Sequence, residues 1–195
     1  MRKSKIIRDT NETKIVLELN LDGSGIYQND TGCGFLNHML DLFAKHGRFD
    51  LQVTCKGDVE VDDKHTVEDV GIARGSAFLQ AIGDKRGIQR YGNFILPMDE
   101  ALILCALDIS GRNCLVFDTT IPAQKVGNFD TELVKEFLLG FCRAFGLTLH
   151  IKQLAGENSH HIIEAIFKGL GKALAQAITV DNKYKDEIPS TKGSL

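Results

Sequence analysis

The sequence predicts an α+β fold made of two pseudo-symmetric strand-strand-helix-strand-helix halves, with sheets packed on helices. Segments that alternate apolar and polar residues, typical of half-buried strands, recur in both halves, and segments with helical apolar spacing follow them in the same order. A long stretch of the first half also aligns with one of the second, which indicates an internal duplication. We expect the first half to cover residues 1–90, the second residues 91–187, and a C-terminal tail residues 188–195.

The first half should contain three strands and two helices. KIVLELNL at residues 14–21 alternates as a half-buried strand does, and Asp22-Gly23 then predicts a turn. The first helix carries apolar residues at helical spacing, and the second carries many small residues, which suits tight packing. The expected strands are Lys14–Leu21, Ser24–Asn29 and Leu51–Cys55, and the expected helices are Phe35–Ala44 and Val67–Ile82.

The second half repeats this order. Its first strand is strongly apolar, and Ser110-Gly111 predicts the turn that follows it. Ser159 is the expected N-cap of the last helix, because a serine hydroxyl can accept a hydrogen bond from the first free backbone N–H groups. The expected strands are Ala101–Ile109, Asn113–Phe117 and Leu147–Ile151, and the expected helices are Asp130–Phe145 and His160–Ile178.

Composition excludes several classes of protein. The chain has 195 residues, 43% of them hydrophobic, and a formal net charge of −3, which gives no basic footprint for nucleic acid. No apolar run is long enough to span a membrane, and the basic N-terminus lacks the apolar stretch of a secretory signal. The five cysteines form no Cys-x-x-Cys pair, so we expect reduced thiols, a cytoplasmic location and no thiolate zinc site.

The duplication pairs polar residues as well as elements. When residues 38–68 are laid over residues 136–164, with two extra residues in the first loop, Lys64-His65-x-x-Glu68 meets His160-His161-x-x-Glu164, and His38 meets Glu136. A doubled His-x-x-Glu at corresponding helix starts is hard to explain by core packing. The alternative, that these are polar helix-start residues without a ligand role, is weakened by the repeat.

Two adjacent histidines at one helix start suggest two metal ions. Neighbouring helical side chains point about 100° apart, so His160 and His161 cannot easily bind one ion, whereas Glu164 shares a helix face with both. Imidazole and carboxylate ligands without thiolate suit manganese, iron, zinc or nickel. Asp62 and Asp63 could cap the equivalent helix or orient His65.

Other polar residues carry weaker signals. Ser190, Thr191 and Lys192 place hydroxyls beside a cation in the tail, which is a reasonable cradle for an oxyanion. Arg90, Arg112 and Glu12 could equally be solvated surface charges. His150 has Gln52 as its counterpart, which breaks the symmetry and favours a structural role.

Seven stretches of the chain resemble the imidazoleglycerol-phosphate dehydratase family, in the same order. They are TGCGFLNHMLDLFAKHGRFDL (31–51), DDKHTVEDVG (62–71), RYGNFILPMDE (90–100), DISGR (108–112), FDTEL (129–133), SHHIIEAIFK (159–168) and PSTKG (189–193). The resemblance covers essentially the whole chain. It implies a hydro-lyase of histidine biosynthesis that converts imidazole glycerol phosphate to imidazole acetol phosphate, through an imidazolate held between two metals.

The resemblance also implies a cofactor, an assembly and a set of site residues. It implies two Mn²⁺ ions per active site and a large homo-oligomer, expected to have 24 subunits, with active sites between subunits. The implied metal ligands are His38, His65, Glu68, His160, His161 and Glu164, together with Glu136, whose position holds histidine in some members and glutamate in others. The implied substrate contacts are Glu12, Arg90, Arg112, Ser190 and Lys192, to which we add Thr191. Residues 188–195 are expected to form a substrate-binding tail. Glu12 and Glu68 are the expected proton-transfer residues.

One position departs from the family pattern. The family has Asp-Asp-His-His-Thr where this chain has Asp-Asp-Lys64-His65-Thr. A protonated ammonium is a poor ligand and repels a nearby cation. This leaves three alternatives open: one metal is weakened or lost, the metal deprotonates Lys64, or another residue substitutes as ligand. The alternative functions are a catalytically impaired or metal-binding oligomeric homologue, and an enzyme with the same metal frame that acts on another sugar phosphate.

Overall fold

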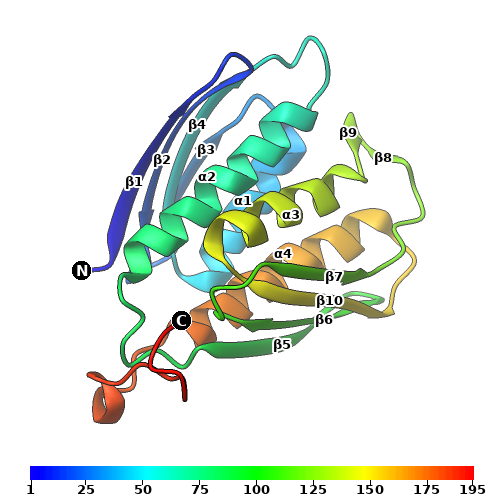
Figure 1. Ribbon diagram of the computed structural model, residues 1–195. Coiled ribbons are helices and arrows are strands. Elements are labelled where there is room, and N and C mark those ends of the chain that lie inside the picture. The colour runs from blue at the N-terminus through cyan, green and yellow to red at the C-terminus, as the bar shows by residue number, and fades with distance from the viewer.

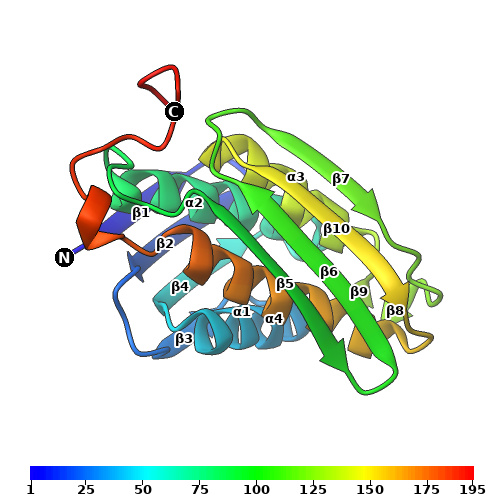
Figure 2. The same ribbon diagram turned by 90° about the horizontal axis from the view of Figure 1, so that it is seen from below.

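The computed structural model describes all 195 residues and contains two four-stranded sheets with four helices between them (Figure 1). Helix α2 packs on the first sheet and α4 on the second, while α1 packs on α4 and α3 on α2. Figure 2 shows the second sheet covering the helices from below. The elements of the first half are β1 (Lys3–Asp9), β2 (Thr13–Asn20), β3 (Tyr27–Asp30), α1 (Gly34–Gly47), β4 (Asp50–Gly57) and α2 (Lys64–Ile82).

The second half repeats these six elements and adds a short hairpin and a terminal 3-10 turn. Its elements are β5 (Tyr91–Met98), β6 (Ala101–Asp108), β7 (Cys114–Asp118), β8 (Lys125–Val126), β9 (Phe129–Asp130), α3 (Leu133–Phe145), β10 (Thr148–Ala155), α4 (Ser159–Ala177) and η1 (Asn182–Tyr184).

The two sheets have the same topology. Their strand orders are β1-β2-β4-β3 and β5-β6-β10-β7. In each sheet the final strand, β3 or β7, is parallel to its neighbour, and all other neighbouring strands are antiparallel. Leu17 lies opposite Val53 in the first sheet, and Cys105 lies opposite Ile151 in the second. The expected α+β fold is therefore confirmed, and the shared topology is consistent with the duplication.

Each half also has a first strand that the sequence analysis missed. Strand β1 forms one edge of its sheet, and its residues alternate only between exposed and half-buried, so its apolar pattern is weak. Strand β5 contains Gly92 and Pro97, which normally interrupt strands, but proline is tolerated on an edge strand. Each half is thus strand, strand, strand, helix, strand, helix.

Some expected boundaries were wrong. Helix α3 begins at Leu133 instead of Asp130, because Phe129 and Asp130 belong to the β8–β9 hairpin. The N-cap of α4 is Asn158, whose side-chain oxygen accepts hydrogen bonds from the backbone N–H groups of His160 and His161 at 2.9 and 3.2 Å. Ser159 was expected there, but its hydroxyl oxygen instead accepts from the N–H of Ala123 at 2.9 Å.

The helices pack closely through small residues, as the composition of the second helix suggested. A Cβ on Gly75 of α2 would lie 2.5 Å from the Phe141 carbonyl oxygen of α3, and one on Gly171 of α4 would lie 2.7 Å from the Phe43 carbonyl oxygen of α1. The duplication relates these two contacts. Both helix pairs can therefore approach closely only with glycine at these positions.

Two further observations concern membranes and cysteines. None of the helices combines the length and apolar character that crossing a membrane requires. All five cysteines are free, and four of them are buried, with Cys114 exposed.

Candidate metal centre

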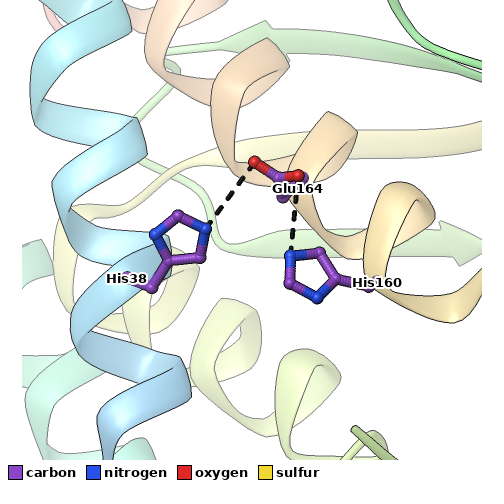
Figure 3. Close-up of side chains that lie close together, drawn as sticks. All are labelled: His38, His160 and Glu164. Carbon is purple, nitrogen blue, oxygen red and sulfur yellow. Dashed lines mark ion pairs between the residues drawn. The ribbon is translucent and has the colours of Figure 1, made fainter.

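Three of the expected ligands meet between α1 and α4. His38 comes from α1, while His160 and Glu164 come from one face of α4, as their i,i+4 spacing dictates (Figure 3). His38 Nε2 lies 3.8 Å from Glu164 Oε1, and His160 Nε2 lies 3.6 Å from Glu164 Oε2. One ligand atom from each residue falls within 4.8 Å of the others. We call these residues the α1/α4 cluster.

The donor set of the α1/α4 cluster fits a divalent metal. Atoms that share one ion at about 2.1 Å lie about 3 to 4 Å apart. The two His–Glu distances fall in this range, though to different oxygens of Glu164, and one atom from each residue lies within 4.8 Å of the others. No member of the cluster hydrogen-bonds to another, so the three residues do not occupy each other's lone pairs. Glu164 is 7% exposed, and its Oε1 lies 3.1 Å from the ammonium of Lys168, which holds the carboxylate in place. Phe35 packs edge-on against the His160 ring.

His161 lies outside this cluster. Its ring centroid is 6.4 Å from that of His160, with 74° between the ring planes, so the neighbouring side chains diverge. Its Nδ1 hydrogen-bonds to Glu100 at 2.7 Å, which raises the pKa of His161 and, together with the backbone N–H of Asn158, lowers the pKa of Glu100 to about 2. The Nε2 of His161 lies 3.6 Å from Asp99.

His65, the counterpart of His161, is held in the same way. Its Nδ1 hydrogen-bonds to Asp58 at 2.9 Å, which raises the pKa of His65, and its Nε2 lies 3.7 Å from Glu12. Asp62, expected to cap the helix or orient His65, accepts from the N–H of Lys64, the first residue of α2, at 2.7 Å and makes no hydrogen bond to His65. Sequence analysis did not single out Asp58 or Glu100, because their contacts with these histidines depend on the paths of the loops after β4 and β5.

The remaining expected ligands, Glu68 and Glu136, lie with Lys64 between α2 and α3, and we call these three residues the α2/α3 cluster. The Lys64 Nζ lies 3.1 Å from Glu68 Oε2 and 4.0 Å from Glu136 Oε2. Arg143 lies 3.2 Å from the other oxygen of Glu68. Burial alone would raise the pKa of Glu68, but Lys64 and Arg143 outweigh it and lower that pKa, while Glu68 raises the pKa of Lys64.

The expected phosphate contacts gather around the C-terminal tail. The Arg90 guanidinium donates to both oxygens of Asp108 at 2.7 and 3.1 Å, and its Nη1 donates to the Pro189 carbonyl at 2.8 Å. Leu195 approaches Gly111, where an added Cβ would lie 3.0 Å from it; the positive φ of +75° also favours glycine there. The tail therefore runs from Arg90 toward the turn that carries Arg112.

The side chains of this region remain available to a ligand. Those of Arg112, Thr191 and Lys192 are exposed and form no hydrogen bond or ion pair within the chain, and Ser190 accepts only from the Lys192 N–H.

Within one chain, the tail and the α1/α4 cluster are far apart. The backbone N–H of Arg90 donates to the carbonyl of Ala177 at the end of α4, whereas His160 lies at its start. Helix α4 has 19 residues, so it separates them by about 27 Å. The chain therefore does not bring its expected metal ligands and phosphate contacts into one site.

Comparison with known proteins identifies the family. The profile of the family described as imidazoleglycerol-phosphate dehydratase matches residues 31–174. The imidazoleglycerol-phosphate dehydratases of Jannaschia sp. (strain CCS1) and Caldanaerobacter subterraneus subsp. tengcongensis are 57% and 58% identical over 195 residues, covering all of both chains in each case.

Solved structures of imidazoleglycerol-phosphate dehydratases have a similar fold. The crystal structure of imidazoleglycerol-phosphate dehydratase from Staphylococcus aureus subsp. aureus N315 shares 40% identity and a TM-score of 0.84, covering 92% of this chain and 99% of that one. That of the enzyme from Pyrococcus furiosus in complex with (S)-C348 gives 40% identity and a TM-score of 0.82, covering 97% and 100%. The chain belongs to the imidazoleglycerol-phosphate dehydratase family and is a hydro-lyase of histidine biosynthesis.

Proposed function

We propose that the chain removes water from imidazole glycerol phosphate, giving imidazole acetol phosphate, with a divalent metal bound by His38, His160 and Glu164. The observation that supports the metal is the convergence of two imidazoles and a carboxylate within 4.8 Å. Manganese suits these ligands. The family resemblance implies two Mn²⁺ per active site, and the α1/α4 cluster supports one of them.

The metal, when bound, supplies Lewis-acid polarisation of the substrate ring and fixes its position. The chain's own residues supply the rest. Lys168 and Phe35 hold Glu164 and His160 in place, so the ligands are oriented in advance. Glu12 lies beside His65 at an exposed surface and, with Glu68, is our candidate for moving the proton.

The phosphate belongs at the tail. Arg90 is ion-paired to Asp108 and donates to the Pro189 carbonyl, so it positions the tail. The free side chains of Arg112, Thr191 and Lys192, with Ser190, would hold the phosphate and orient the remote reacting atoms.

The active site is completed by neighbouring copies of the chain. His65 and His161 are anchored through Nδ1 to carboxylates, and neither belongs to its own chain's α1/α4 cluster. That arrangement is typical of metal ligands held by a carboxylate behind them. With the 27 Å separation along α4, it supports a homo-oligomer whose sites lie between subunits, which we propose to have 24 copies. The five free cysteines support a cytoplasmic location.

The test combines metal analysis with a dehydration assay. The His160→Ala variant should lose at least about 10-fold in manganese affinity and in rate, since it removes one of three ligands. His150→Ala is the matched control, because His150 is an exposed histidine on β10 outside the cluster. The proposal is contradicted if the protein dehydrates the substrate at full rate after metal removal. It is also contradicted if His160→Ala has the same manganese affinity and rate as His150→Ala.

One observation favours a second candidate, an impaired metal-binding homologue. Lys64 occupies a family histidine position and is ion-paired to Glu68. The same assay separates the candidates, because the impaired homologue binds manganese at the α1/α4 cluster without dehydrating the substrate.

A further inference from the structure

The duplication gives each residue of the α1/α4 cluster a counterpart in the α2/α3 cluster. Glu68 corresponds to Glu164, and each lies four residues after Lys64 or His160 on its helix. Glu136 on α3 corresponds to His38 on α1. The two helix pairs have the same close glycine contact, so the backbone that presents both clusters is alike. Differences between the clusters therefore come from the side chains.

One similarity shows which side chain matters. In both clusters a cation pairs with one oxygen of the central carboxylate: Lys168 lies 3.1 Å from Glu164, and Arg143 lies 3.2 Å from Glu68. The other carboxylate oxygen differs. In the α1/α4 cluster it faces the His160 ring 3.6 Å away, whereas in the α2/α3 cluster it accepts a hydrogen bond from the Lys64 ammonium at 3.1 Å.

The Lys64 ammonium also lies 4.0 Å from Glu136, so it sits between the two carboxylates. An ammonium has three donors and no lone pair, and it cannot ligate a metal. Lys64 and Arg143 lie at the two oxygens of Glu68, and the Lys64 ammonium also faces Glu136, so a divalent ion would have to displace this ammonium and would be repelled by it. The donor set of the α2/α3 cluster therefore does not fit a metal.

We propose that the Lys64 ammonium is the resident cation of the α2/α3 cluster, which binds no metal. One chain then holds one metal ion at these paired clusters, where the family resemblance implies two. This inference rests on the proposed function for the α1/α4 metal. It assigns Lys64 as a fixed positive charge beside Glu68, present whether or not metal is supplied.

The first experiment is a metal count on the unmodified, full-length protein. Stripped protein is reloaded with Mn²⁺, and the bound metal per chain is measured by mass spectrometry and by Mn²⁺ electron paramagnetic resonance. We expect one ion per chain. Two ions per chain would overturn the inference, and this measurement needs no variant to fold.

The second experiment exchanges the side chains of the two clusters. The double variant Lys64→His/Glu136→His gives the α2/α3 cluster the donors of its counterpart and should raise the count from one to two. The mirror variant His38→Glu/His160→Lys should lower it from one to zero. A folded Lys64→His/Glu136→His variant, verified by circular dichroism, that still binds only one ion would show that these side chains do not decide metal binding.

The outcomes for metal and for activity are separable. Dehydration is assayed on the same preparations. One bound ion without dehydration leaves the inference standing and overturns the proposed function. Dehydration with two bound ions in the unmodified protein supports the proposed function and overturns the inference.

Discussion

Arg74 is the residue whose surroundings fit its chemistry least. Its side chain on α2 is fully buried, its three guanidinium nitrogens have no hydrogen-bond partner, and the group lies 3.3 Å from the centroid of the Phe43 ring. Burial lowers the pKa of Arg74 well below its usual value. Contact with an aromatic face offsets only part of the cost of removing a charge from water.

We therefore expect Arg74→Met to stabilise the protein. Replacing buried ion pairs with apolar side chains of similar volume stabilises by about 1 to 4 kcal/mol in many cases, and Arg74 lacks even a hydrogen-bond partner to lose. The measurement is the midpoint of thermal or urea unfolding. Lys135→Met is the control, because Lys135 is exposed on α3 and makes no ion pair. A lower midpoint for Arg74→Met than for Lys135→Met would show that the guanidinium has a stabilising partner in the assembled protein.

Asn158 stabilises the helix start that carries His160. Its side chain satisfies the backbone N–H groups of both His160 and His161. Asn158→Ala should lower the free energy of unfolding by about 1 kcal/mol, or the melting temperature by about 2–4 °C, because two N–H groups lose their acceptor. Asn11→Ala, at an exposed asparagine with no side-chain hydrogen bond, should leave the melting temperature unchanged. Equal shifts for the two variants would contradict this role.

At the scale of elements, the helices and strands that could be predicted from the sequence are those with a clear apolar periodicity. The four helices and six of the strands have apolar patterns strong enough to find. Strands β1 and β5 were missed because their patterns are weak or interrupted by Gly92 and Pro97. The ligand candidates came from the doubled His-x-x-Glu spacing. Their carboxylate partners, Asp58 and Glu100, depend on loop paths that no local pattern encodes.

The close contact between α1 and α4 couples packing to the metal cluster. Gly171→Ala would place a Cβ 2.7 Å from the Phe43 carbonyl and separate α1 from α4, which moves His38 away from Glu164. We expect a loss of about 1–3 kcal/mol in stability, typical of overpacking, together with weaker manganese binding. Unfolding by urea and titration with Mn²⁺ measure the two effects.

Gly75→Ala is the matched control for Gly171→Ala. It would place a Cβ 2.5 Å from the Phe141 carbonyl and separate α2 from α3 instead. We expect a similar loss of stability, with manganese affinity at the α1/α4 cluster unchanged. If the two variants weaken manganese binding equally, the effect is general loosening of the fold and not displacement of His38.

At the scale of the whole molecule, the separation between tail and metal cluster makes a prediction about assembly. A site that takes its metal from one copy and its phosphate contacts from another can be rebuilt from two differently damaged chains. His160→Ala removes a metal ligand, and Lys192→Ala removes a phosphate contact of the tail. Each variant alone should therefore catalyse dehydration of the substrate slowly. Unfolding the two together and refolding them as a mixture should restore activity, because some sites receive both intact parts.

Random mixing of equal amounts would make about a quarter of such shared sites fully intact, so the mixture should recover about a quarter of the unmodified rate. Mixing His160→Ala with His38→Ala is the control, since both damage the same cluster and no combination rebuilds it. Light scattering on the same samples checks that all mixtures assemble to one size. Activity of the His160→Ala and Lys192→Ala mixture that stays at the level of the separate variants would show that each chain builds its site alone.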